Sequence, residues 1–480
     1  MSRIQAVQLT GQLKVRQMFA WAFGGTIGAA WITMTGIWIG QAGSIGSLTG
    51  LVLGGLVILM VVLCYAEMAS IYPVAGAELV FAYETFGPKI AFATGWMALL
   101  LLSTVLAFLA VSAGWIFSAL FPGIQSPVIY EAYGAGISVL DLLVAVGSIL
   151  IFSWLNIRGG GTAASFQDWS TAALILSALV VIVTGLALGS VENLTPAFID
   201  QNDGDFVHGI LVIFATSPLW YGGFNVLSQA MGERAEDVNA GKAATAMLLS
   251  TAAAMLFYAL LVMATAMTMP REQLLQLNLP VAGALEHITG SVFVGKAVLI
   301  VGFLGIVTSI NGLLFAASRV IFSLGRSRLL PPVFSAIHSR HGSPFVAIAT
   351  IGLMSALISL LGLGAISRLV NVGGMCFALL FLVVTASVFR LRYVNPDINR
   401  PFRIHKGKFV SGLATVCVFS LLAWSAWDTR PRGDGYIPVE WALFFGWAAV
   451  GAIAWLLTGT TRSSVTEPER QRLILGQNTE

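Results

Sequence analysis

Charged residues are scarce in this sequence. Of its 480 residues, 10% are Asp, Glu, Lys or Arg, whereas a soluble domain typically has about 25%. Hydrophobic residues make up 57% of the chain, and the mean hydropathy is +0.87. Because a soluble core cannot hide this much apolar surface, we expect a membrane protein whose surrounding solvent is lipid.

Cysteine is scarce too, and catalytic motifs are missing. Cys64, Cys376 and Cys417 fall in apolar runs without a CxxC pair, which disfavours a disulfide framework and a metal knuckle. The sequence has no HExxH, GxSxG or P-loop lysine, and "GGTIGAA" follows no strand as a dinucleotide fingerprint would. We therefore expect no enzyme, no organic cofactor and no nucleic-acid partner. The tail after about residue 459 is too short for a signalling domain, while a channel stays open as an alternative.

Long apolar runs are what the sequence has instead. A helix needs about 20 apolar residues to cross the hydrocarbon, and the alternating pattern of membrane strands is absent. Twelve runs are long enough, so the sequence predicts an all-α membrane protein with twelve transmembrane helices. The predicted spans are residues 18–40, 47–72, 90–120, 136–156, 165–189, 206–230, 243–269, 291–323, 345–362, 367–389, 409–427 and 439–458.

Basic residues predict the orientation. An even number of spans places both termini on one side, and that side holds all but five of the 25 Lys and Arg residues. The exceptions are Arg271, Lys296, Arg368, Arg430 and Arg432. By the positive-inside rule, both termini of this multi-pass protein of the plasma (inner) membrane are predicted to be cytoplasmic. The basic stretch "RPFRIHKGK" (400–408) is interpreted as a cytoplasmic loop near anionic lipid headgroups.

Helix-breaking residues gather in the first and sixth spans. The first contains "GGTIGAAW" (24–31), and the sixth contains "FATSPLWYGGFN" (214–225), in which Pro218 has no N–H. Spans interrupted by Gly or Pro at corresponding positions indicate an inverted repeat. The predicted organisation is a cytoplasmic N-terminus (1–16), two five-helix repeats (17–190 and 206–393), two extra helices (409–458) and a cytoplasmic tail (459–480).

Broken backbone in a membrane predicts a ligand site. Unpaired N–H and C=O groups are tolerated there only around a cavity or a ligand. Helix N-termini suit a carboxylate, and freed carbonyls suit an ammonium or a metal cation. The two breaks therefore predict a mid-membrane site for a small zwitterion or amine. The alternative is close helix packing, which is how we interpret the GxxxG pattern of Gly36 and Gly40.

Three stretches resemble a known family. They are residues 27–30 at the first break, "YAEMASIYPVAGAELVFAYETFG" (65–87) and "NGLLFAASRVIFSLGRSRLLP" (311–331). Over most of residues 17–395 the chain resembles the amino acid–polyamine–organocation permeases. The resemblance implies a five-plus-five inverted fold with helices 1 and 6 broken, and secondary transport of an amino acid by alternating access. An amine or polyamine permease and an amino acid exchanger are the alternatives.

The resemblance also implies a substrate site at the two breaks. Many members have Gly-Ser-Gly or Gly-Thr-Gly at the first break, whereas this chain has Gly28-Ala29-Ala30. The carboxylate pocket is then made by main-chain amides alone, or it is absent. Trp220 and Tyr221 either attract an ammonium or pack between helices. The expected substrate-binding residues are Thr26, Ile27, Gly28, Ala29, Ala30, Trp31, Phe214, Ser217, Leu219, Trp220, Tyr221 and Gly222.

The resemblance leaves the coupling ion open between Na⁺ and H⁺. Some proton-coupled relatives carry a lysine in the fifth span, where this chain has Leu174. Similar transporters that use sodium hold it between the first and eighth helices with two adjacent hydroxyls. A sodium site is accordingly expected at Gly24, Ile27, Gly305, Thr308 and Ser309. The alternative is that the two hydroxyls bond back to carbonyls one turn earlier, with proton coupling or substrate exchange driving transport.

Polar residues near the cytoplasmic side are expected to gate the pathway. Glu67 belongs to the family motif, and its expected partner is Arg158 or Arg319. Asn225 and Glu233 in the second half of the sixth span are expected to make polar interhelical contacts. The expected partners of the whole protein are a small amino acid or amine and the lipid bilayer, with the protein a monomer or a homodimer.

Overall fold

The structure is a bundle of long helices. The computed structural model describes residues 14–477 apart from 125, 159, 200–204, 232–233, 236–237 and 431–436, and describes only the backbone of 160–168. Within these residues, ten helices are long and apolar enough to cross a membrane, and they coincide with ten of the twelve predicted spans. They are formed by α3 (Thr35–Ile71), α5 (Pro88–Leu120), α6 (Val139–Ile157), α7 (Gly160–Leu188), α8 (Val207–Tyr221) with α9 (Asn225–Gln229), α10 (Ala240–Met267), α13 (Val292–Arg326), α15 (Ile366–Val394), α16 (Gly407–Asp428) and α17 (Val439–Leu457).

The two other predicted spans are shorter or divided. Residues 345–362 contain α14 (Phe345–Ser359), an apolar helix of 15 residues. Residues 18–40 are divided among α1 (Val15–Ile27), α2 (Ala30–Thr33) and the beginning of α3. The long helix α3 then bends at Gly43, whose φ is 78°.

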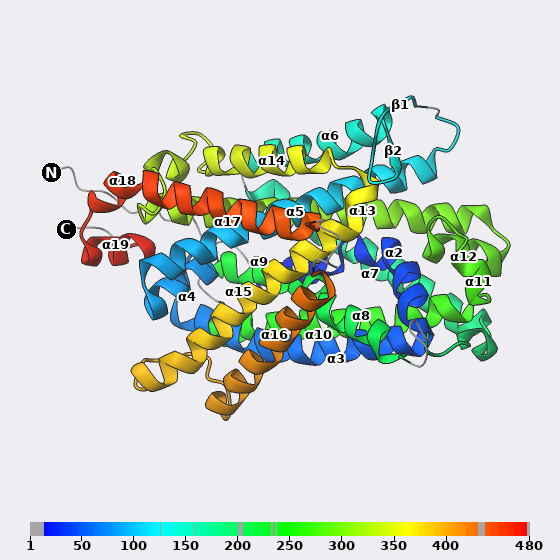
Figure 1. The fold of residues 1–480 in the computed structure, drawn as a ribbon, viewed down its shortest axis with the longest axis horizontal. Coiled ribbons are helices and arrows are strands. Elements are labelled where there is room, and N and C mark those ends of the chain that lie inside the picture. The colour runs from blue at the N-terminus through cyan, green and yellow to red at the C-terminus, as the bar shows by residue number, and fades with distance from the viewer. Residues whose placement is uncertain are drawn as a thin grey trace.

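Short elements gather at the two ends of the bundle. The antiparallel strands β1 (Val128–Ala132) and β2 (Ala135–Ser138) lie at one end with α11 (Arg271–Leu274) and α12 (Pro280–Thr289). The other end holds α4 (Ala77–Phe86), α18 (Gly459–Ser463) and α19 (Glu467–Ile474) (Figure 1). The 3₁₀ segments are η1 (Val191–Leu194), η2 (Gly222–Phe224), η4 (Pro332–Ser335) and η5 (Leu363–Ala365).

Burial divides the helices into an interior and a periphery. Nearly all of the apolar window of α5 is buried, and most of that of α13 is, whereas most of that of α17 is exposed. In the interior, α5 packs on α13 and α3 packs on α8 and α10. A helix exposed on its apolar faces is one that contacts lipid, so α16 and α17 form the outer layer around the irregular segments described next.

Candidate functional site

The backbone of the first span is interrupted at Gly28. Helix α1 ends at Ile27, and Gly28 has φ 37° and ψ −136° before α2 begins at Ala30. A positive φ is strained for a residue with a Cβ but not for glycine. The hydroxyl oxygen of Tyr258 on α10 lies 3.1 Å from the Thr26 carbonyl oxygen and 3.2 Å from that of Ile27. The Tyr258 hydroxyl therefore donates one hydrogen bond that is shared between the Thr26 and Ile27 carbonyls at the end of α1.

The sixth span changes its helical form four residues after its proline. Helix α8 continues through Pro218 to Tyr221, and the 3₁₀ segment η2 follows before α9 begins at Asn225. The irregular segment is thus at the Gly222-Gly223 pair. A proline costs a helix one hydrogen bond and strains the preceding turn, and membrane helices accommodate this through neighbouring groups.

The two irregular segments are in backbone contact. A Cβ placed on Gly223 would lie 2.1 Å from the backbone nitrogen of Thr26 and 2.3 Å from the carbonyl carbon of Gly25. The contact is also close on the other side, because a Cβ placed on Gly25 would lie 3.4 Å from the Gly223 carbonyl oxygen. Segments almost 200 residues apart in the sequence (24–31 and 214–225) therefore meet inside the bundle because both lack side chains at the contact.

Helix α13 also packs against the first interruption. The Ser309 hydroxyl donates to the Gly24 carbonyl oxygen at 2.8 Å, so α13 and α1 are joined. The Thr308 hydroxyl donates to the Gly305 carbonyl oxygen at 2.7 Å within its own helix. Of the five residues of the expected sodium site, Gly24 and Ser309 are in contact, Gly305 and Thr308 are bonded to each other within α13, and the Ile27 carbonyl accepts from Tyr258 on α10.

An apolar side chain of the fifth span, Leu174, lies beside the first interruption and α13. A Cβ on Gly305 would lie 2.8 Å from Leu174 Cδ1, 3.4 Å from the Gly28 carbonyl oxygen and 3.8 Å from Trp31 Nε1. Leu174 is 1% exposed. The fifth span thus presents a methyl group, not an ammonium, to the interface between the first interruption and α13.

The expected aromatic residues of the sixth span are packed between helices. The Trp220 ring lies edge-to-face with Trp38 at 5.3 Å, and its indole N–H donates to Thr216. The Tyr221 hydroxyl donates to the Leu51 carbonyl oxygen at 3.0 Å, and its ring contacts Tyr258. These are the contacts of interhelical packing, the second of the two roles expected for this pair.

The other expected substrate residues divide between two faces. Ala29, Ala30 and Trp31 are buried at the first interruption, and the Trp31 indole N–H has no hydrogen-bond partner there. Residues on α8 point elsewhere: Ser217 lies against Gly54 of α3, and Leu219 against Gly373 of α15. Phe214 is half-buried, with its carbonyl oxygen toward Gly54, while Gly222 lies under the ring of Phe377.

The partners of Glu67 differ from those expected. Its carboxylate accepts from Arg392 and lies 3.3 Å from Arg400 Nε, and it also accepts from the backbone N–H of Ile404. The two arginines follow the tenth predicted span, far from Arg158 and Arg319 in the sequence. Arg158 instead lies over the ring of Trp154 at 3.9 Å, and Arg319 over that of Phe315 at 3.6 Å.

A polar cluster lies beside α9, and it includes Asn225, for which a polar interhelical contact was expected. Glu78 on α4 is 1% exposed and accepts hydrogen bonds from the Tyr65 hydroxyl and from the side-chain amide of Gln229. Gln229 also accepts from the backbone N–H of Gly76 at 3.0 Å, and Asn225 bonds Glu78 as well. The sequence signal for this cluster is Glu78, shortly after the second predicted span, together with Gln229 near the end of the sixth. Glu233 lies outside the described residues.

Fold and site together define a class, a multi-pass helical membrane protein whose interrupted first helix meets a second irregular segment in the interior. The chain belongs to the amino acid permease family, whose model matches residues 13–453. The branched-chain amino acid permease BcaP of Bacillus subtilis is 28% identical over 92% of each chain. The methylthioribose transporter of Bacillus subtilis is 28% identical over 90% of each chain. Cationic amino acid transporter 7, chloroplastic, of Arabidopsis thaliana is 27% identical over 95% of this chain and 76% of its own.

The family assignment confirms the resemblance found in the sequence. It also excludes the enzyme alternative, because the family and these relatives are permeases and transporters. The protein is therefore a small-molecule transporter of the amino acid permease family.

Proposed function

We propose that the protein is a secondary transporter that carries a neutral amino acid across the plasma membrane by alternating access. The observation that carries this proposal is the backbone contact of Gly223 with Gly25 and Thr26. It joins the interruptions of the first and sixth spans, as expected for a ligand site at the centre of two repeats. The substrate carboxylate would bind main-chain amides at residues 28–30, and its ammonium would bind carbonyls freed at the two interruptions.

The contacts around the interruptions favour a substrate with a neutral, apolar side chain. The groups in contact are carbonyls, hydroxyls, and aliphatic and aromatic side chains. Leu109 lies 3.5 Å from a Cβ placed on Gly28, and the Trp31 ring lies edge-to-face with that of Phe257. A cationic side chain buried among such groups would pay a desolvation cost without a counter-charge. The name of the branched-chain relative agrees with this choice, while the cationic and methylthioribose relatives define the competing substrate classes.

The proposed architecture has twelve spans, in which two inverted five-helix repeats precede two further helices and both termini are cytoplasmic. The short elements β1, β2, α11 and α12, all predicted for the outer side, lie at one end of the bundle, and α4, α18 and α19, predicted for the cytoplasmic side, lie at the other (Figure 1), which supports this topology. One repeat would rock against the other around the two interruptions. The transporter would work as a monomer or a homodimer.

We propose that a cation bound between α1 and α13 drives transport, with sodium as the first choice. The carbonyls of Gly24, Ile27 and Gly305 and the hydroxyls of Thr308 and Ser309 would supply the oxygen ligands that hard cations prefer. Leu174, at about the position where some proton-coupled relatives are expected to carry a lysine, offers methyl groups and no titratable ammonium beside Gly305. Proton coupling and exchange are the competing mechanisms, and uptake with choline replacing sodium separates them. Unchanged uptake would eliminate sodium.

Counterflow of labelled substrate tests the carrier proposal. Vesicles containing the purified protein are loaded with unlabelled leucine, valine, lysine, a polyamine or methylthioribose, and entry of labelled leucine is followed. Leucine and valine should drive saturable accumulation, whereas lysine should not. The absence of counterflow with every compound would contradict a carrier. In the same assay, Ala30→Gly should admit larger neutral side chains, and an unchanged profile would show that the Ala30 methyl does not limit the pocket.

A further inference from the structure

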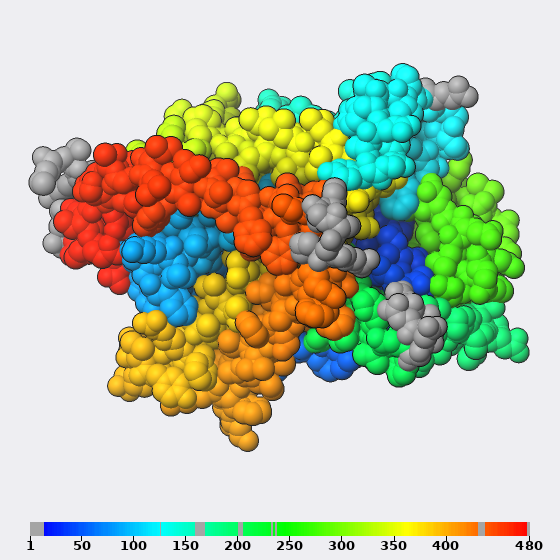
Figure 2. All heavy atoms as spheres, in the orientation of Figure 1, coloured from blue at the N-terminus to red at the C-terminus, as the bar shows by residue number. Residues whose placement is uncertain are grey.

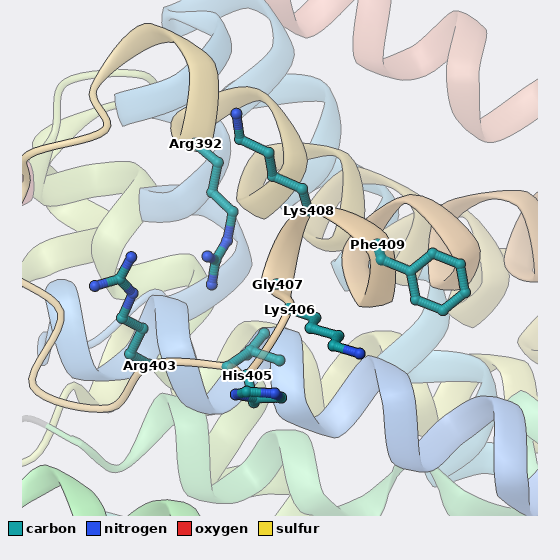
Figure 3. A pocket seen from close by; sticks show the side chains of 8 residues that line it. Arg392, Arg403, His405, Lys406, Gly407, Lys408 and Phe409 are labelled. Carbon is teal, nitrogen blue, oxygen red and sulfur yellow. The ribbon is translucent and has the colours of Figure 1, made fainter.

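A large basic pocket lies far from the interruptions, where α15 ends and α16 begins. Its volume is about 940 Å³, and four of its eight lining residues are Lys or Arg while none is acidic. Figure 3 shows Arg392 and Arg403 extending toward the same space, with the beginning of α16 beside them. We call this the basic pocket. It is lined by Arg392, Arg403, Ile404, His405, Lys406, Gly407, Lys408 and Phe409.

The loop that forms the basic pocket is held in place by α3. Glu67 binds both Arg392 and Arg400 and accepts from the backbone N–H of Ile404. A further hydrogen bond joins the loop to α3, because the Phe402 N–H donates to the Ser70 hydroxyl at 3.2 Å. A single carboxylate therefore serves two arginines. The remaining charges of the loop are not neutralised by it, and the pocket keeps a net positive charge.

Hydrogen-bond donors converge at the beginning of α16. Lys406 precedes the 22-residue helix with a φ of 52° and makes no side-chain cap. Its carbonyl accepts from the N–H groups of Phe409 and Val410, which leaves the N–H groups of Gly407 and Lys408 as the donors at the beginning of the helix. Arg392 lies against them, since a Cβ on Gly407 would be 2.0 Å from its Cζ. Arg392 is 9% exposed, and its Nε–H has no hydrogen-bond partner. Buried donors of this kind call for an acceptor, and amides with guanidinium groups suit a phosphate.

An apolar stripe continues from the basic pocket along α16. Phe409, Leu413 and Val416 are 68%, 39% and 63% exposed, and their spacing places them on one face of the helix. At about 1.5 Å per residue, α16 is long enough to cross the hydrocarbon. This stripe therefore runs from a charged membrane surface into the lipid. The corner formed by α15 and α16 projects from the bundle (Figure 2), where lipid can reach it.

We propose that the basic pocket binds the phosphate headgroup of an anionic phospholipid, whose acyl chains lie along Phe409, Leu413 and Val416. A free phosphate ion would use the charges but not the stripe, so the stripe favours the lipid as the source of the phosphate. Basic pockets on the cytoplasmic side of membrane helices are suited to such headgroups. Tyr393, whose ring lies 4.2 Å from Lys408 Nζ, adds an aromatic group at the level of the headgroup.

The test uses the full-length protein in a neutral detergent. Its thermal unfolding is followed while short-chain phosphatidylglycerol, phosphatidylcholine or inorganic phosphate is added, because a bound ligand raises the unfolding temperature. Phosphatidylglycerol should stabilise at the lowest concentration. The variant R403Q/K406Q/K408Q changes exposed side chains only. At about fivefold per charge it should weaken phosphatidylglycerol binding roughly 100-fold.

Two further variants make the outcomes decisive. K89Q/R340Q/R472Q removes the same charge from exposed positions outside the pocket, and it should bind phosphatidylglycerol as the unmodified protein does. Phe409→Ser should weaken phosphatidylglycerol binding several-fold and leave phosphate binding unchanged. Equal losses in the two triple variants would show a non-specific charge effect and overturn the proposal. Equal stabilisation by phosphate and phosphatidylglycerol would assign the pocket to a soluble anion and overturn the lipid.

Discussion

At the scale of single residues, Gly223 is the position where the two halves of the candidate site depend on a missing side chain. Its ideal Cβ would lie 2.1 Å from the Thr26 nitrogen, which is backbone and cannot rotate away. We expect Gly223→Ala to lower the free energy of unfolding by about 1–3 kcal/mol, the usual cost of overpacking, and to abolish transport. Thermal unfolding and counterflow measure the two effects.

The matched control for Gly223 is Gly147 on α6, where a Cβ would meet nothing within 4 Å. Gly147→Ala should leave transport intact and stabilise its helix by about 0.5–1 kcal/mol. If Gly223→Ala behaved like this control, the contact between the two interruptions would not be needed for the site.

Glu78 makes stability depend on pH. It is buried on α4, which is not among the candidate spans, and burial raises its pKa from 4.5 to about 7 against the opposing effect of its hydrogen bonds. A raised native pKa means that the folded state binds more protons than the unfolded state between pH 4.5 and 7. Stability therefore falls as pH rises through this window, by roughly 3 kcal/mol in total.

Replacing Glu78 should remove this dependence. Unfolding temperatures of the unmodified protein should decrease from pH 5 to pH 8, and those of Glu78→Gln should be nearly flat over the same range. Glu131→Gln serves as the control, because this exposed residue lies on β1 at the other end of the bundle. A slope that persists in Glu78→Gln would assign the pH dependence to other groups.

The sequence predicts some residues of the site better than others. Gly24 and Ser309 meet, as the expected sodium site requires, because glycines and hydroxyls act through the backbone, whose course the helix pattern largely sets. The partners of Glu67 could not be predicted, since any of several arginines was compatible with a buried carboxylate. Trp220 and Tyr221 are similar cases, because their neighbours come from α3 and α10.

At the scale of elements, the contact of α1 with α13 bears on the coupling ion. Ser309 bonds across to α1, whereas Thr308 bonds within α13. If sodium binds here, Thr308→Ala and Ser309→Ala should each lower the apparent sodium affinity by about tenfold or more, since each removes one oxygen ligand. Substrate affinity in saturating sodium should change less. Uptake measured against sodium and substrate concentrations separates the two constants.

The control for these variants is a buried threonine in another helix whose hydroxyl also donates to a carbonyl about one turn earlier. Thr251 on α10 is buried and donates to the Met247 carbonyl oxygen at 3.0 Å, one turn away. Thr251→Ala should leave both affinities unchanged. Equal loss of sodium and substrate affinity in Thr308→Ala would instead support a structural role for that hydroxyl.

Elements were predictable where apolar length alone determines them. Ten spans coincide with long helices because about 20 apolar residues in lipid have few alternatives to a helix. Within the second helix-breaking cluster (214–225), the helix continues through Pro218 and changes to 3₁₀ form at Gly222. The apolar pattern did not predict β1 and β2, because a short exposed hairpin leaves no long apolar run.

At the scale of the whole molecule, topology is the property that sequence and structure constrain together. The positive-inside rule predicts that the end with α4 and α19 faces the cytoplasm and that the end with β1 and β2 faces outward. Those elements lie at opposite ends of the bundle (Figure 1). A membrane-impermeant maleimide reagent can therefore determine the orientation from two exposed positions, one at each end.

The labelling experiment starts from a variant whose three native cysteines are replaced by alanine, two of them being buried and one partly buried. Glu131→Cys on β1 should react with the reagent in intact cells, because β1 is predicted to face outward. Lys89→Cys, at the beginning of α5 beside α4, should react only after the membrane is permeabilised. Reaction of Lys89→Cys in intact cells would reverse the predicted orientation. It would also place the basic pocket at the outer leaflet, because residue 89 and the α15–α16 loop are both assigned to the basic side of the protein by the same charge count.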